Sequence, residues 1–193
     1  GTIAFIIMST WRRGRELVLR EVQQGGLALE PFIASISAHP PLRVPGTAVF
    51  LTANRNSVPN ALLHNLKHNK VLHERNVLLT VETVDTPIAE ADERVEVHDL
   101  GNDFFQMLLR YGFAEDLDVP EFLLKIDQCG GPFDLMDTTF FISRESIIAG
   151  EQKGMAKWRD RIFAFLSRNA TPATAYFQIP GNRLIELGTQ LEI

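Results

Sequence analysis

The chain has 193 residues, of which 45% are apolar, and a formal net charge of −5 at neutral pH. This length suits one domain of ordinary size, or one domain with an appended segment. The single cysteine, Cys129, excludes an internal disulfide framework and agrees with a reducing compartment. Residues 1–24 carry a charge of +2, which leaves −7 for residues 25–193. Because such an acidic body has no broad basic face to neutralise phosphates, nucleic acid is not an expected partner.

The chain begins with an apolar run from Thr2 to Met8. An aromatic residue and three arginines come soon after it: Trp11, Arg12, Arg13 and Arg15. This order is typical of a membrane-spanning helix that leaves the bilayer on the cytoplasmic side, so these four residues are the predicted membrane interface. A full span needs about 20 apolar residues, so we interpret residues 1–10 as only the last turns of a transmembrane helix. The alternative is a buried strand or the end of a core helix.

Residues 11–43 are expected to connect this segment to a compact body. Arg12 to Gln24 is predicted to be a juxtamembrane helix, which the pairs Arg12/Glu16 and Glu16/Arg20, each four residues apart, would stabilise. A pair of glycines would end that helix. A second short helix is predicted around Pro31–Ala38, with two prolines after it as the stop.

The compact body is expected to span residues 44–193 and to begin with a βαβ unit. Thr47–Thr52 is a short apolar run that predicts a buried strand, and Asn76–Glu82 predicts a second. Between them a helix is predicted, with Ser57 as its N-cap and a proline in its first turn. That helix would turn three leucines inward: Leu62, Leu63 and Leu66. The two strands are expected to be parallel, with a right-handed connection.

The remaining elements complete an expected α/β class with a mixed sheet and flanking helices. A polar loop is predicted over Val84–Glu93. Strands are predicted over Arg94–His98, Phe104–Phe113 and Thr138–Ser143, with one or two short strands in Asn182–Ile193. The second of these segments could also be a helix, but its aromatic residues favour a strand. Helices are predicted over Pro120–Gln128 and Met155–Ser167.

The polar loop after the first strand of the βαβ unit is the candidate ligand-binding site. Its residues are Asn54, Arg55, Asn56 and Ser57. In an α/β unit this position favours ligands, and free N–H groups at the start of a helix suit an anion such as a phosphate. The loop lacks the glycines of a P-loop or of a dinucleotide fingerprint. The alternative is simple turn chemistry, because asparagine readily bonds to its own backbone.

The sequence indicates no enzyme, metal site or cofactor. His64 and His68 lie four residues apart on the predicted helix, with His73 just beyond, which is possible spacing for zinc. Their polar neighbours favour a solvated helix face, and no cysteine or well-placed carboxylate completes a site. The segment Ser143–Ser146 follows a strand, but it is not a nucleophile elbow. No catalytic residue is therefore predicted.

Several stretches of the chain resemble the Kup/HAK/KT family of potassium uptake proteins. They are Thr10–Gly14, Arg43–Thr52, Pro59–Arg75, Tyr111–Phe113, Thr138–Glu145 and Ile179–Ile193. The resemblance covers essentially the whole chain. It is weakest over residues 84–94 and 150–157, which look like freely varying surface.

The resemblance implies that the chain is the cytoplasmic C-terminal domain of a multi-pass potassium transporter of the cell (inner) membrane. Members of the family are similar to proton-coupled symporters, so the intact protein would import potassium together with protons. The residues that bind these ions would belong to membrane helices and have no counterpart in this chain. For the domain itself, the resemblance implies regulation or the assembly of a homodimer. The alternative is a domain that senses a nucleotide effector, such as cyclic di-AMP, and gates the transporter.

Overall fold

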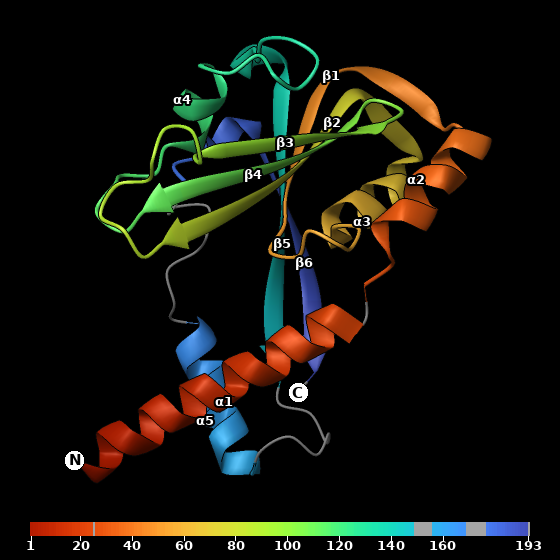
Figure 1. Cartoon of the computed structure of the whole chain (residues 1–193). Coiled ribbons are helices and arrows are strands. Elements are labelled where there is room, and N and C mark those ends of the chain that lie inside the picture. Colours follow the sequence, from red (N-terminus) through yellow and green to blue (C-terminus); the bar gives the residue numbers. More distant parts are fainter. Residues whose placement is uncertain (25, 149–155, 169–176, 193) are drawn as a thin grey trace. The chain divides into compact units, whose positions relative to one another are not determined.

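A computed structural model describes residues 1–24, 26–148, 156–168 and 177–192 of the chain (Figure 1). Its contacts divide the chain into two compact units. Unit 1 comprises Gly1–Gly26, Arg144–Pro172 and Gly188–Ile193, and unit 2 comprises Leu27–Ser143 and Ala173–Leu187. The division into residues 1–10, 11–43 and 44–193 stays a prediction.

The described residues form six strands, five α-helices and two short 3₁₀ helices. The strands are β1 (Leu42–Leu51), β2 (Val71–Val84), β3 (Val95–Gly101), β4 (Phe104–Gly112), β5 (Thr138–Ile148) and β6 (Leu184–Glu192). The α-helices are α1 (Thr2–Gln24), α2 (Leu29–Ala38), α3 (Asn60–Asn69), α4 (Val119–Leu123) and α5 (Lys157–Arg168). The 3₁₀ helices are η1 (Leu135–Asp137) and η2 (Gly181–Arg183).

The strands form one mixed sheet in the order β3-β4-β2-β1-β5-β6. β1 pairs in parallel with β2 on one side and with β5 on the other, and β2 pairs in parallel with β4. Only the hairpin of β3 and β4 is antiparallel among the pairs whose register the structure describes. The prediction of a mixed α/β sheet is confirmed. The unit β1-α3-β2 is the parallel βαβ unit that the sequence predicts.

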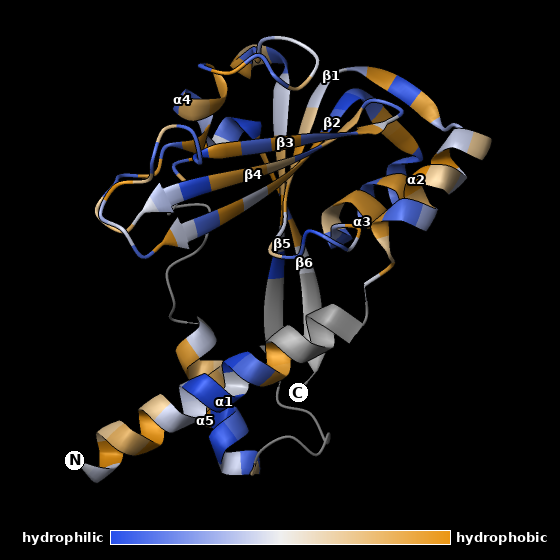
Figure 2. Cartoon of the chain, viewed as in Figure 1, coloured by the Kyte–Doolittle hydropathy of each residue, from blue (hydrophilic) through white to orange (hydrophobic). Residues whose placement is uncertain are grey.

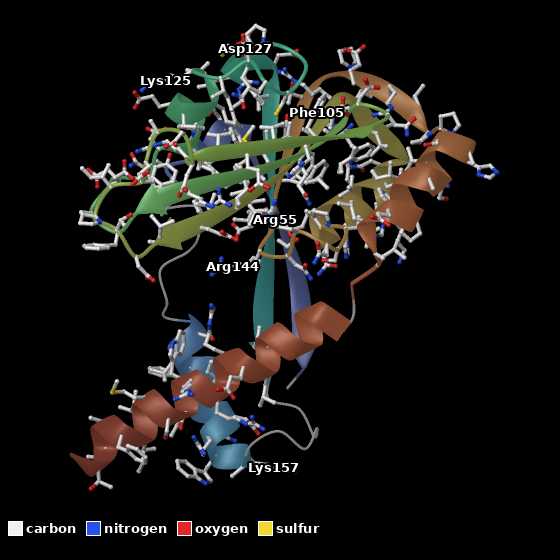
Figure 3. The ribbon with its side chains drawn as sticks, viewed as in Figure 1. Arg55, Phe105, Lys125, Asp127, Arg144 and Lys157 are labelled. Carbon is white, nitrogen blue, oxygen red and sulfur yellow. The ribbon has the colours of Figure 1, made fainter. Side chains whose placement is uncertain are left out.

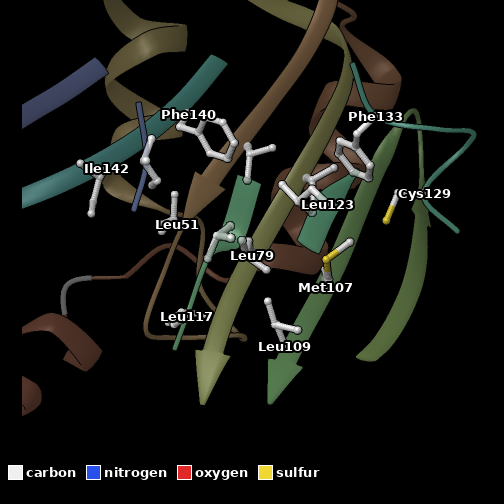
Figure 4. Close-up of a cluster of buried hydrophobic side chains, with 14 of the residues drawn as sticks. Leu51, Leu79, Met107, Leu109, Leu117, Leu123, Cys129, Phe133, Phe140 and Ile142 are labelled. Atoms are coloured by element: carbon white, nitrogen blue, oxygen red, sulfur yellow. The ribbon is translucent and has the colours of Figure 1, made fainter. Parts of the chain in front are cut away.

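The sheet of unit 2 is buried on both faces, because the middle of each central strand, such as Ala48–Leu51 of β1 and Val77–Leu79 of β2, is apolar at successive positions. Val49 and Phe50 of β1 are adjacent and fully buried, and they belong to clusters on opposite faces. On one face, shown in Figure 4, the cluster includes Leu51, Leu79, Met107, Leu109, Leu123, Cys129, Phe133 and Phe140. The cluster of the other face includes Ala48, Phe50, Leu72, Leu78, Phe104 and Phe141.

Helices cover both faces of this sheet. α2 and α3 lie on one face (Figure 1), where Phe32, Ile36 and Leu62 join the second cluster. The short helix α4 covers the opposite face through Val119 and Leu123. Flanking helices are thus confirmed.

Two local predictions differ from the structure. Ser57 does not cap α3, which begins at Asn60 after Pro59 and has no side-chain cap. The helix predicted over Pro120–Gln128 ends at Leu123, because the chain must then turn to place Cys129 in the core. The prediction of one or two short strands in Asn182–Ile193 is confirmed, because the described residues of this segment form the strand β6 after a 3₁₀ turn.

The other predicted elements are present, although β1 and β2 each begin five residues earlier than predicted and β5 ends five residues later. The segment of uncertain type is strand β4, and α5 begins at Lys157. The predicted start of that helix, Met155, lies outside the described residues.

α1 of unit 1 is one unbroken helix that contains both the apolar run and the predicted juxtamembrane helix. The exposed fractions of Ile3, Phe5 and Met8 are 75%, 72% and 72%, so the alternative of a buried core element does not hold for them. Figure 2 shows this apolar end of α1. No helix within the described part of the chain is both long and apolar enough to span a bilayer. A transmembrane helix ahead of this domain stays a prediction.

α1 and α5 pack closely within unit 1 because Gly14 lacks a side chain at their contact. A Cβ atom on Gly14 would lie 2.4 Å from the ring of Phe163, which is fully buried. The same ring meets Trp11, with 5.5 Å between ring centroids. Beside them, Arg159 Nε donates to Oγ1 of the buried Thr10 at 3.0 Å. The motif Thr10–Gly14 thus forms the surface of α1 against which α5 packs.

Glu115 fastens the loop between β2 and β3 to the end of β4. Its Oε2 accepts the backbone N–H of Ala89 at 3.0 Å and that of Gly112 at 2.7 Å. Its Oε1 accepts from Arg94 Nη2 at 2.5 Å. The N–H of Ala89 first, then the N–H of Gly112 and the Arg94 guanidinium, lower the pKa of Glu115 to about 2, although desolvation opposes them.

We expect Glu115→Gln to destabilise unit 2 by about 1–2 kcal/mol at neutral pH, because bonds to a charged acceptor become bonds to a neutral one. The folded carboxyl has a lowered pKa, so its contribution is complete above the ordinary value of 4.5 and is lost as the pH falls toward 2. The stability difference between wild type and variant should therefore shrink over that range in urea titrations followed by circular dichroism. Asp116→Asn, next to it and exposed, is the control. An equal difference at neutral pH and about pH 3 would contradict this account.

Candidate functional site

The predicted ligand loop lies at the point where the order of the strands reverses. β1 has β2 on one side and β5 on the other, and the loop Asn54–Ser57 follows the carboxyl end of β1. In open α/β sheets, ligands bind in the crevice at such a switch point. The position is therefore favourable, although the loop's own chemistry decides what it can hold.

Short hydrogen bonds within the loop account for its shape. Thr52 Oγ1 accepts the N–H of Asn54 at 3.2 Å, and Asn54 Oδ1 accepts the N–H of Asn56 at 3.0 Å. The carbonyl of Asn56 accepts the N–H of Leu29 at 3.1 Å, and Ser57 forms an isolated bridge with Ala28. These bonds are those of an ordinary turn, which is the alternative to ligand binding that the sequence left open. They also engage two N–H groups that an anion would otherwise bind.

Arg55, labelled in Figure 3, pairs with a side chain of strand β3. Its Nη2 lies 3.2 Å from Glu96 Oε1, and Arg110 Nη2 lies 2.9 Å from Glu96 Oε2. His98 Nε2 is 2.8 Å from the same carboxylate. Hydrogen bonds from His98, Arg55 and Arg110 lower the pKa of Glu96 to about 2. Arg55 is thus already paired, and an anionic ligand would have to compete with Glu96 for it.

Two clefts flank the loop, one on either side along the chain. The first has about 230 Å³ and is lined by Leu51, Thr52, Ala53, Leu79, Val81, Ile142, Ser143 and Phe177. The second has about 350 Å³ and is lined by Ala28, Leu29, Glu30, Pro31, Arg55, Asn56, Leu100 and Gln106. Ligand pockets usually have about 300–1,000 Å³, so only the second reaches that range, at its lower end. In the first, Ser143 Oγ is buried without a hydrogen-bond partner among the described residues.

The partners of Arg55 are not among the residues predicted from the sequence, although a signal for them exists. Glu96 and His98 are two residues apart in a strand with period-two alternation, so they share one face. Arg110 and Gln106 lie on the neighbouring strand, and Gln106 Nε2 donates to the Arg55 carbonyl at 2.5 Å. The contact between these strands and the loop is long-range, so the sequence pattern does not predict it.

The predicted membrane-interface residues all lie on α1 of unit 1. Arg12 and Arg13 pair with Glu16 at 3.4 and 3.2 Å, which confirms the predicted pair of Arg12 and Glu16. Trp11 is half-buried against α5, and Arg15 is exposed. The predicted pair of Glu16 with Arg20 cannot be followed, because the side chain of Arg20 lies outside the described residues.

The histidines do not converge on a metal. His64 and His68 have ring centroids 5.6 Å apart, and His73 instead meets the ring of Phe141. Burial lowers the pKa of His73. Over the part of the chain that the structure covers, no group of three or more His, Cys, Asp or Glu side chains could hold a metal ion. Burial raises the pKa of the Cys129 thiol to about 11, as for a core residue rather than a nucleophile.

Together, the fold and the loop define a small α/β domain with an open mixed sheet and an ion-paired loop at its switch point. Residues 45–193 match the family model described as the K+ potassium transporter C-terminal domain, and the chain belongs to this family. The resemblance to potassium uptake proteins is thereby confirmed.

The similar curated proteins are bacterial potassium transport proteins. The chain is 55% identical over 194 residues to the "Probable potassium transport system protein Kup" of Xanthomonas euvesicatoria pv. vesicatoria. It is 52% identical over 194 residues to the protein of the same name from Xylella fastidiosa (strain Temecula1), and 49% identical over 193 residues to "Kup 2" of Chromobacterium violaceum. Each alignment covers 100% of this chain but 31% of the relative, so the chain spans about a third of their length. No solved structure matches the chain.

Proposed function

We propose that the chain is the cytoplasmic C-terminal domain of a potassium transporter of the bacterial inner membrane, and that it regulates the carrier or assembles it as a homodimer. The observation that carries this proposal is the 55% identity over the whole chain to part of a longer potassium transport protein. The intact protein imports potassium by proton symport through membrane helices outside this chain. The domain needs no catalytic residue or cofactor for such a role.

Features of unit 1 support attachment to a membrane at the amino-terminal side. The exposed apolar end of α1 is followed by Trp11 and by the cations of Arg12, Arg13 and Arg15. Arginines near the end of a span favour the cytoplasmic side, and an aromatic residue favours the interface. A helix that continued from α1 into the bilayer would therefore place the rest of the chain in the cytoplasm.

Deletion of residues 44–193 from the intact transporter tests the proposal. In cells that lack other potassium uptake systems, we expect the uptake rate to change severalfold or the cross-linked dimer to disappear. A changed rate with an intact dimer assigns regulation, whereas loss of the dimer assigns assembly. The control is Asp92→Ala, an exposed substitution in the loop between β2 and β3. Normal uptake and normal dimers, at normal levels of the truncated protein in the membrane, would contradict both roles.

A second candidate function is the sensing of a nucleotide such as cyclic di-AMP. It is favoured by the position of Asn54–Ser57 at the switch point, with the second cleft and Arg55 beside it. Calorimetry of the chain with cyclic di-AMP and with ATP tests it. We expect binding that Arg55→Ala weakens about tenfold, as for the loss of one charge-assisted contact, and that Lys125→Ala leaves unchanged. No heat with either nucleotide at high micromolar concentration would exclude this function.

A further inference from the structure

We propose that α5 is an interfacial helix that binds the surface of an anionic bilayer through Trp158, Phe165 and the cationic side chains beside them. The proposal concerns unit 1 only. It deepens the proposed function, and it rests on that function for the presence of a membrane next to this unit.

The outer face of α5 is apolar with a cationic border. Trp158 and Phe165 are seven residues apart, which places them on the same side of a helix, and they are 53% and 63% exposed. Ile162, half-buried, lies between them on this face. Lys157 and Arg161, both exposed, border the aromatic pair. Aromatic residues on one side and basic residues beside them are the pattern of helices that lie in the membrane interface.

An apolar groove continues this face onto α1. It has about 940 Å³ and is lined by Phe5, Ile7, Met8, Ser9, Trp11, Arg12 and Leu166. Leu166 belongs to α5, one turn after Ile162, and the other lining residues belong to α1. The two helices therefore present one extended apolar surface. Exposed patches of this kind mark sites that bind a membrane or a partner.

The contact between the helices places α5 at the level of the lipid head groups. Arg159 donates to Thr10 and lies 3.4 Å from Ser9 Oγ, while Phe163 packs against Trp11 and Gly14. These residues of α1 are the segment in which the helix is proposed to leave the bilayer. A helix packed against them lies at the same depth, where Trp158 meets the environment that tryptophan prefers.

The charges of the two units select lipid as the occupant. Unit 1 contains ten Lys and Arg against six Asp and Glu, a net charge of +4. Unit 2 contains nine against eighteen, a net charge of −9. Anionic lipids attract basic residues near the surface and repel an acidic body.

The two tryptophans allow each helix to be observed separately, because both lie in unit 1, one on α1 and one on α5. Trp11→Phe leaves Trp158 as the reporter of α5, and Trp158→Phe leaves Trp11 as the reporter of α1. Each chain is mixed with vesicles of phosphatidylcholine, with or without phosphatidylglycerol, some of which carry brominated acyl chains. We expect the emission of Trp158 to shift to the blue and to be quenched by bromine only when phosphatidylglycerol is present.

Charge reversal tests the electrostatic part of the proposal. Lys157→Glu with Arg161→Glu should lower the affinity for anionic vesicles at least tenfold, as expected when two surface cations are replaced by anions. The matched control is Lys67→Glu with Lys125→Glu, two exposed positions in unit 2 that change the net charge equally. The control should stay within about twofold, because its charges lie on unit 2 and outside the proposed lipid-binding face of α5. An equal loss in both variants would overturn the proposal.

The fluorescence results separate this proposal from the proposed function. Quenching of Trp11 without quenching of Trp158 means that α1 meets the membrane and α5 does not, which overturns this inference alone. A lipid-free dimer in ultracentrifugation that shields Trp158 from a soluble quencher makes a second copy the occupant and also overturns it. A response of Trp158 to both kinds of vesicle would refute the selection of anionic lipid.

Discussion

Replacing Arg75 with alanine is expected to destabilise unit 2 by about 3 kcal/mol, because one side chain holds an entire turn in place. Its Nη1 donates to the carbonyl of Gly131 at 2.8 Å and lies 3.3 Å from that of Cys129, while Nη2 donates to the carbonyl of Pro132 at 3.1 Å. The guanidinium carbon also lies 4.3 Å above the ring of Phe133. Bonds to a charged group contribute about 1.5–3 kcal/mol each, but bonds that share one group are not additive.

The turn needs Arg75 because its own backbone cannot satisfy these carbonyls. Gly130 and Gly131 have φ values of +80° and +125°, so the chain here is in neither a helix nor a strand. On one side of them Cys129 is fully buried, and on the other Phe133 is 5% exposed. Without the guanidinium, three carbonyls at the edge of the core lose a charged donor. The packing of the buried Cys129 and Phe133 on either side of the turn is then weakened as well.

Two control substitutions accompany the stability measurement on Arg75→Ala. Arg75→Lys keeps the charge but not the planar fork, so it should recover less than half of the loss. Arg15→Ala, an exposed position in unit 1, should change the stability of unit 2 by less than about 0.5 kcal/mol. Because both tryptophans lie in unit 1, urea unfolding of unit 2 is best followed by far-UV circular dichroism. A loss below about 1 kcal/mol for Arg75→Ala would show that the turn does not depend on this side chain.

The sequence predicts the sheet well because strands that are buried on both faces appear as uninterrupted apolar runs. The buried middle of β1 and that of β2 are continuous apolar runs, and a helix of suitable length separates the two strands, so the parallel unit follows. β4 was the ambiguous segment, since a run with Phe104 and Leu108–Leu109 suits a buried helix or a buried strand. Its pairing with β2 on one side and β3 on the other decides for the strand, and such pairing is tertiary information.

The candidate loop illustrates where prediction from sequence stops. The run of asparagines indicates turns, and Asn54 does form one with Asn56. The same pattern cannot reveal that Arg55 meets Glu96, which lies 41 residues later on β3. Long-range charge pairs depend on strand order, which composition and spacing leave open. The resemblance, by contrast, identifies the family correctly.

The folded chain explains why a glycine stands at the centre of the motif Tyr111–Phe113. Beside it, the loop after β2 returns, with the N–H of Phe113 donating to the carbonyl of Thr86 at 3.0 Å and that of Ala114 to Pro87 at 3.1 Å. The two segments approach so closely that the residue between Tyr111 and Phe113 has no room for a side chain. Glu115 adds its two backbone bonds across the same contact.

Gly112→Ala should therefore destabilise unit 2 by about 3 kcal/mol or more, at the upper end of overpacking effects. A Cβ atom here would lie 2.2 Å from the carbonyl oxygen of Pro87 and 2.5 Å from Cα of Ile88. Both are backbone atoms, so no rotation of a side chain can relieve the overlap, and the loop must move away. That movement would also break the bond between Ala89 and Glu115, so hydrogen exchange at the Ala89 amide should rise together with the loss of stability.

Gly181→Ala is the matched control, because nothing lies within 4 Å of a Cβ atom at that position and its φ is not positive. The same added methyl group should there cost less than about 0.5 kcal/mol. If Gly112→Ala were as mild as this control, the close approach of the loop would not be a feature of the protein in solution. The comparison separates steric exclusion from the general effect of replacing glycine, since alanine restricts the unfolded chain equally in both variants.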